Sequence, residues 1–177
     1  MFIWFCKVYF KIAGWKITGE EIPKDLRRYV LIAAPHTSNW DFPIGIGARS
    51  FMGLNTNFIG KASLFKPPLG WLMRKLGGFP VDRSKRTNFV DQAVQLFNDN
   101  DPFSITMAPE GTRKKVETWK SGFYHIAHQA KVPLVMIGFD YPNKEIRFLG
   151  LYHPTGDYDK EILEIRSFFD GIKGKNY

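Results

Sequence analysis

Short apolar runs alternate with segments of helical periodicity along this chain, and this alternation limits the folds that it can adopt. The runs with the length and composition of buried strands are residues 29–35, 57–61, 78–83, 103–108, 133–140 and 145–151. The segments with helical spacing of apolar residues are 42–52, 71–76, 89–97, 119–131 and 162–169. This alternation predicts an α/β fold in which a mixed, mostly parallel sheet is flanked by helices. Sites in such folds collect at the carboxyl ends of the strands.

Length and composition indicate one domain over residues 1–177. The chain is 44% hydrophobic and 24% charged, which is ordinary for a globular protein with a sizeable core. Residues 173–177 are expected to fray. A formal net charge of +8 favours phosphate-bearing partners, namely anionic lipid surfaces, coenzyme A, acidic carrier proteins or nucleic acid. Nucleic acid is not expected, because the aromatic residues are dispersed and form no RNA-binding signature.

Residues 1–15 combine aromatic and aliphatic side chains with Lys7 and Lys11. The segment is shorter than the about 20 apolar residues that a spanning helix needs, and its lysines follow the first apolar residues, unlike those of a signal peptide. It predicts an interfacial helix at the level of lipid headgroups, whereas a first helix packed on the core explains it equally well. The chain's one cysteine, Cys6, has no partner for an internal disulfide. We therefore expect a cytoplasmic protein, or one bound peripherally to the cytoplasmic face of a membrane.

One polar block follows the first strand-like run and places His36 and Asp41 five residues apart. The intervening Thr37, Ser38 and Asn39 favour a bend, so that Asp41 can turn its carboxylate back to one imidazole nitrogen. The other ring nitrogen could then remove a proton from a hydroxyl group. The sequence has no G-x-S-x-G elbow, so the attacking hydroxyl would belong to a substrate and transfer would be direct. The alternative is a histidine that only completes hydrogen bonds at a strand end.

A second block, Pro-Glu-Gly-Thr-Arg at residues 109–113, follows another strand-like run. Five specified residues would occur by chance in a chain of this length only about once in ten thousand. This block therefore shifts the interpretation of His36 and Asp41 from structure toward catalysis.

Together with two further segments, these blocks resemble the glycerolipid acyltransferase family, whose best-known members are the 1-acyl-glycerol-3-phosphate (lysophosphatidic acid) acyltransferases. The four family blocks appear in the family's order: H-x4-D at 36–41, G-x4-R at 78–83, P-E-G-T-R at 109–113, and a variant of V-P-x-x-P within 131–137, with Met136 where a second proline is usual. The resemblance covers about residues 30–140, the motif-bearing core. It implies a single-domain, glycerol-3-phosphate acyltransferase-like sandwich.

The resemblance also implies site residues. His36 would be the general base, oriented by Asp41. The acceptor and its phosphate would be bound by residues of the other blocks and of the lysine-led segment at 61–65: Lys61, Arg83, Glu110, Gly111, Thr112 and Arg113. Arginine suits this role because its guanidinium donates two parallel hydrogen bonds to a phosphate.

The function implied is transfer of a fatty acyl chain from acyl-coenzyme A or acyl-carrier protein to the hydroxyl of a lysolipid, most of all 1-acyl-glycerol-3-phosphate. The expected partners are these substrates and an anionic membrane surface. Neither a cofactor nor a metal is expected, since the thioester donor is already activated and His125 and His128 lack matching ligands. Two alternatives stay open: the same chemistry on a lyso-aminolipid, and a non-catalytic peripheral protein that binds membrane or lipid.

Overall fold

The computed structural model describes residues 1–81 and 86–176. Within these residues, seven strands form one sheet in the order β1-β7-β6-β2-β5-β3-β4. Neighbouring strands are parallel, apart from the antiparallel pair β6–β7. The strands are β1 (Lys16–Gly19), β2 (Arg28–Ala34), β3 (Asn57–Lys61), β4 (Gly78–Val81), β5 (Phe103–Met107), β6 (Leu134–Asp140) and β7 (Glu145–Tyr152). The predicted α/β class with a mixed, mostly parallel sheet is confirmed.

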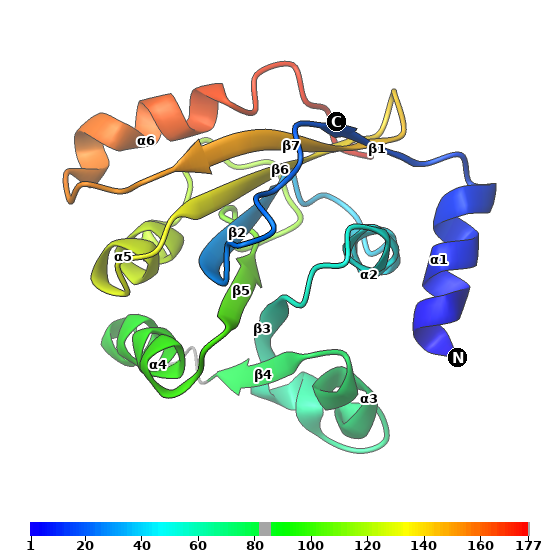
Figure 1. Ribbon diagram of the computed structural model, residues 1–177, viewed down its shortest axis with the longest axis horizontal. Helices are drawn as coiled ribbons and strands as arrows, with labels where there is room; N and C mark the ends of the chain where they lie inside the picture. Colours follow the sequence, from blue (N-terminus) through cyan, green and yellow to red (C-terminus); the bar gives the residue numbers. More distant parts are fainter. Residues whose placement is uncertain (82–85, 177) are drawn as a thin grey trace.

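Helices cover both faces of the sheet (Figure 1). The helices are α1 (Phe2–Ile12), α2 (Asp41–Phe51), the 3-10 helix η1 (Ala62–Phe65), α3 (Gly70–Lys75), α4 (Arg86–Asp99), α5 (Gly122–Gln129) and α6 (Tyr158–Ser167). One apolar core lies between the sheet and α4, α5 and α6, and a second lies between the sheet and α1 and α2. Three layers result, with the sheet in the middle.

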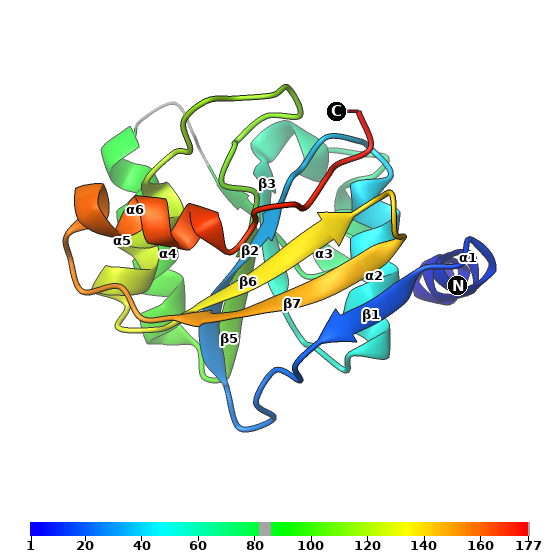
Figure 2. The ribbon, with the colours of Figure 1, turned by 90° about the horizontal axis from the view of Figure 1, so that it is seen from above.

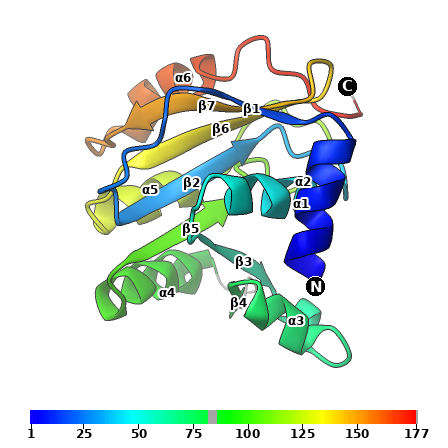
Figure 3. The same cartoon turned by 45° about the vertical axis from the view of Figure 1, so that its right-hand side comes forward.

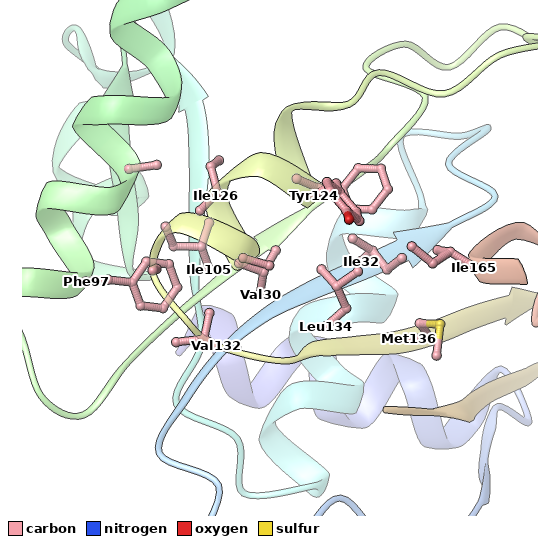
Figure 4. Close-up of a cluster of buried hydrophobic side chains, with 14 of the residues drawn as sticks. Val30, Ile32, Phe97, Ile105, Tyr124, Ile126, Val132, Leu134, Met136 and Ile165 are labelled. Atoms are coloured by element: carbon pink, nitrogen blue, oxygen red, sulfur yellow. The ribbon is translucent and has the colours of Figure 1, made fainter. Parts of the chain in front are cut away.

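Strand β2 shows how the sequence produces these two cores. Successive side chains of a strand point to opposite faces. Accordingly, Val30 and Ile32 join the core under α5, which Figure 4 shows in close-up, whereas Tyr29 and Leu31 join the core under α2. Because both faces are covered, the strand reads in the sequence as a continuous apolar run rather than as an alternating one.

Several elements differ from the prediction: η1 was not predicted, and α6 begins at Tyr158 rather than at 162. Strand β1 was not predicted, because it pairs with β7 at the edge of the sheet and three of its four residues are exposed. Helix α5 begins at Gly122 rather than at 119. The N–H of Lys120 instead donates to the carbonyl of Pro109 (2.9 Å), which ties this segment to the loop that follows β5.

The parallel arrangement brings the predicted motifs together. Strands β2, β3 and β5 run in the same direction, so the segments that follow Ala34, Lys61 and Met107 emerge at one edge of the sheet. These segments carry the His36, Lys61 and Arg113 blocks. The edge is the one where parallel α/β folds place their sites.

Candidate active site

His36 and Asp41 form a close pair at the carboxyl end of β2. His36 lies in the loop after the strand and Asp41 is the first residue of α2. The distance between His36 Nδ1 and Asp41 Oδ2 is 2.9 Å. The aspartate side chain is only 2% exposed, whereas that of the histidine is 27% exposed. The buried carboxylate therefore holds an imidazole that substrates can reach.

Asp41 accepts several further hydrogen bonds. The backbone N–H groups of Thr37 and Ser38 donate to Oδ2 at 2.8 and 2.9 Å, and the Tyr141 hydroxyl donates to Oδ1. Burial alone would raise the pKa of Asp41, but the hydrogen bonds from His36, Tyr141 and Ser38 outweigh it and hold the pKa below its ordinary value. An ionised carboxylate can only accept, so His36 Nδ1 carries the proton in this pair, and the neutral form of the ring has its lone pair on Nε2.

Glu110 also binds the loop that carries His36. It is 5% exposed, and its Oε1 accepts the backbone N–H of His36 at 2.9 Å. Burial raises its pKa, while Oε2 has no hydrogen-bond partner within the described residues. The glutamate borders a cavity of about 160 Å³ and is absent from the lining of the large cleft. Its observed contact positions the His36 backbone, and a direct contact with an acceptor stays a prediction.

A cleft of about 2040 Å³ opens beside the His36–Asp41 pair, and both residues line it. Predicted binding residues that also line it are Lys61, Gly111, Thr112 and Arg113. The exposed side chains of Lys61 and Arg113 form no ion pair with any carboxylate in the described part of the chain. Both cations are thus available to an anionic ligand. Arg83 lies outside the described residues.

The turn at Gly111 has a clear physical basis. Its φ is +64°, and a Cβ atom there would lie 2.9 Å from the side chain of Lys120. Glycine adopts such a backbone without steric cost. The next residue, Thr112, accepts the N–H of Lys114 with its hydroxyl (3.3 Å) and so stabilises the turn that presents Arg113.

Part of the lining of the cleft is apolar. Its aliphatic and aromatic residues come mainly from α2, β3 and β6 and include Phe42, Ile46, Met52, Phe58, Ile137 and Phe139. The His36–Asp41 pair, the cations Lys61 and Arg113, and these apolar residues therefore line one cleft. Within the described residues, no group of three or more His, Cys, Asp or Glu side chains is arranged to hold a metal ion.

Two contributions to this site were missed in the sequence. Tyr141 directly follows β6, which is parallel to β2, so a polar residue at the end of a predicted strand was the available signal. Residues 173–176, expected to fray, instead lie on the His36 loop: the N–H of Lys175 donates to Thr37 Oγ1 (2.8 Å) and Asn176 Nδ2 donates to the Thr37 carbonyl (2.5 Å). No sequence pattern indicates this contact.

The sequence of this chain is similar to those of known acyltransferases. It is 32% identical to an uncharacterised acyltransferase of Schizosaccharomyces pombe, over 84% of this chain and 54% of the relative. It is also 32% identical to a 1-acyl-sn-glycerol-3-phosphate acyltransferase of Saccharomyces cerevisiae, over 69% and 41%, and 29% identical to that of Streptococcus pneumoniae, over 72% and 50%. The chain thus spans about half the length of the curated relatives it matches.

The fold is also that of a solved structure. The 1-acyl-sn-glycerophosphate acyltransferase PlsC of Thermotoga maritima aligns with a TM-score of 0.68 at 23% identity, over 98% of this chain and 80% of that one. The model of the family described as Acyltransferase matches residues 15–140, which include all four motif blocks. This protein belongs to the Acyltransferase family.

Proposed function

We propose that this protein transfers a fatty acyl chain from an acyl thioester to the free hydroxyl of a lysolipid, with 1-acyl-glycerol-3-phosphate as the first-choice acceptor. The observation that carries the proposal is the His36–Asp41 pair, at 2.9 Å, on the wall of a cleft large enough for lipid substrates. The family and the names of the relatives support this acceptor class.

The chemistry follows from the ring nitrogens of His36. Nε2 takes the proton of the acceptor hydroxyl as its oxygen attacks the thioester carbonyl, and Asp41 stabilises the imidazolium that forms. Collapse of the tetrahedral intermediate breaks the carbon–sulfur bond, and the imidazolium returns the proton to the leaving thiolate. The new ester and a free thiol are the products. The thioester is already activated, so the step needs no additional cofactor.

The loop also offers a donor for the oxyanion. Among its described residues, the N–H groups of Thr37 and Ser38 bind Asp41 and that of Trp40 binds the Ser38 hydroxyl. The N–H of Asn39 is left for the negative oxygen of the intermediate. Donors held in place before the reaction stabilise such an oxygen without reorganisation.

Charged and apolar residues of the cleft would bind different parts of the substrates. Lys61 and Arg113 would bind the phosphate of the acceptor through charge-assisted hydrogen bonds, with Arg83 as a third cation. The apolar lining residues from α2, β3 and β6 would contact acyl chains. Coenzyme A and acyl-carrier protein are both compatible with the thioester chemistry as donors.

The surface beside the cleft suits a membrane. Exposed apolar residues gather on α1 and on η1–α3, together with Leu69 before α3: Ile3, Trp4, Phe5, Leu64, Leu69 and Trp71, which we call the apolar rim. Leu64 and Leu69 also line the cleft. We place the protein peripherally on the cytoplasmic face of an anionic membrane, from which a lysolipid would enter the cleft. No helix in the described part of the chain has the length and apolar character needed to cross a bilayer.

The test is acyl transfer from labelled acyl-coenzyme A and acyl-carrier protein to a panel of lysolipids. We expect lysophosphatidate to be acylated, His36→Ala to abolish the reaction, and Arg113→Ala to raise KM about 10-fold or more, the effect of one lost charge-assisted contact. His153→Ala and Arg27→Ala are the matched controls, since these exposed residues lie outside the cleft lining.

Other outcomes would select the alternatives. Transfer only to an amino-acid-headed lysolipid, lost in His36→Ala but kept in Arg113→Ala, would mean the same chemistry on another acceptor. Vesicle binding without any His36-dependent transfer would contradict an enzymatic function.

A further inference from the structure

The segment after α6 crosses the loop that carries His36. Figure 2 shows the end of the chain, in red, passing over the light-blue segment that follows β2. Three hydrogen bonds fix residues 173–176 there. The N–H of Lys175 donates to Thr37 Oγ1 (2.8 Å), Asn176 Nδ2 donates to the Thr37 carbonyl (2.5 Å), and the N–H of Tyr141 donates to the carbonyl of Lys173 (2.9 Å).

The two residues held by this segment, Thr37 and Tyr141, are among those that bind Asp41. The N–H of Thr37 donates to Asp41 Oδ2 and the hydroxyl of Tyr141 donates to Oδ1. Thr37 is only 1% exposed, so its hydroxyl and carbonyl are shielded from water while the segment is in place. Each of the two residues therefore bonds to Asp41 with one group and to residues 173–176 with another.

The close approach at Gly174 indicates a specific fit. A Cβ atom at this position would lie 2.5 Å from Thr37 Cγ2, 2.6 Å from Thr37 Oγ1 and 3.2 Å from Pro35 Cγ. Such distances require a shift, and the atoms met are near the Thr37 backbone rather than at the end of a flexible side chain. Either the segment would move away or Thr37 would rotate, and both movements would break the bond between Thr37 Oγ1 and Lys175.

We infer that residues 173–176 are a positioning strap of the active site, which holds Thr37 and Tyr141 so that Asp41 keeps His36 in its reactive orientation. This role rests on the proposed catalytic function of His36 and Asp41. The strap acts through Thr37 and Tyr141 and need not touch the reacting atoms. Small misplacements of a catalytic group cost large factors in rate, which is why a remote contact of this kind matters.

Two variants approach the contact from opposite sides. Thr37→Val keeps the volume and the N–H to Asp41 but removes the acceptor for Lys175, and Gly174→Ala displaces the strap. We expect each to lower kcat about 10- to 100-fold with KM changed less than about twofold. Thr37→Ser restores the acceptor and should recover most of the rate. The matched control is Thr18→Val on edge strand β1, which removes a hydroxyl hydrogen bond to Glu145 of β7 and should leave kcat unchanged.

Amide hydrogen exchange of the same variants separates positioning from general stability. Loss of the strap should speed exchange at the Thr37 and Ser38 amides, which bind Asp41, while the sheet keeps its protection. Unchanged kcat in Thr37→Val and Gly174→Ala would overturn the inference, and so would an equal loss of protection throughout the molecule. If the native protein shows no His36-dependent transfer, the proposed function fails, but loop exchange still tests the hold of the strap on the loop.

Discussion

Tyr141 is the residue whose contact with Asp41 most extends the predicted catalytic pair. Burial, followed by the hydrogen bond to Asp41, raises the pKa of its phenol, so it remains a donor throughout the range in which an enzyme works. An edge-to-face contact with Trp15, with ring centroids 4.8 Å apart, fixes the ring. Tyr141 therefore stabilises the ionised form of Asp41 through a charge-assisted hydrogen bond.

Replacing Tyr141 with Phe removes that bond and keeps the ring. Hydrogen bonds to charged groups contribute about 1.5–3 kcal/mol, so we expect kcat to fall about 10-fold or more. The pKa of Asp41, held low in the native protein, should rise, and the acidic limb of the rate profile should move to higher pH. Activity measured across pH checks both effects. Tyr152→Phe, which removes a bond to Glu164 on the surface, should change neither; an unchanged acidic limb in Tyr141→Phe would contradict the role.

At the scale of elements, the docking of α6 depends on Glu161. Its Oε1 accepts hydrogen bonds from the Tyr124 hydroxyl on α5 (2.7 Å) and from the Thr155 hydroxyl (2.6 Å), and the N–H groups of Thr155 and Asp157 add to these. Burial alone would raise the pKa of Glu161, but these hydrogen bonds outweigh it and lower the pKa to about 2. One carboxylate thus joins two helices on the same face of the sheet.

The lowered pKa sets the pH range in which Glu161 stabilises the fold. The ionised form is favoured in the folded state, so its contribution is complete above the ordinary glutamate pKa of about 4.3 and is lost as the pH falls toward 2. We expect Glu161→Gln to lower the free energy of unfolding by about 1.5–3 kcal/mol at pH 7 and by less at pH 3. Urea unfolding at both pH values measures this. Glu164→Gln on the same helix is the control, and a difference independent of pH would argue against the ionised carboxylate.

The elements that the sequence predicts best are the strands buried on both faces. The predicted and observed limits of β2, β5 and β6 agree within about one residue, because a central parallel strand is a continuous apolar run. Edge strand β1 lacks that signal, since only one of its residues is partly buried. The pattern of apolar residues in the sequence therefore identifies buried strands, and it does not identify a strand that is mostly exposed.

The contacts of the candidate site also fall into those that the sequence predicts and those that it does not. His36 and Asp41 are close in sequence, and a local bend brings them together, so their pairing could be anticipated from the motif alone. Tyr141 lies 100 residues from Asp41, and Lys175 lies 138 residues from Thr37. Such contacts depend on the order of strands in the sheet and on the path of the chain after α6, which no local pattern contains.

At the scale of the whole molecule, net charge and exposed apolar surface both bear on the proposed membrane binding. The chain carries a formal net charge of +8, which favours the surface of an anionic membrane. Figure 3 shows the start of α1 on the same side of the molecule as α3. In the apolar rim, Trp4 and Trp71 are 68% and 67% exposed, so both rings can enter the interface without disturbing the core.

We therefore predict that the apolar rim binds anionic vesicles. Burying a large apolar side chain contributes about 1.5–3 kcal/mol, so the double variant Trp4→Ser, Trp71→Ser should bind phosphatidylglycerol vesicles at least about 100-fold more weakly. Binding of the native protein should also weaken with salt, since screening reduces the attraction of its positive charge. Co-sedimentation over a range of lipid and salt concentrations measures both. Leu163→Ser, at an exposed position on α6, should bind like the native protein; if it weakens binding as much as the double variant does, association is not directed by the rim.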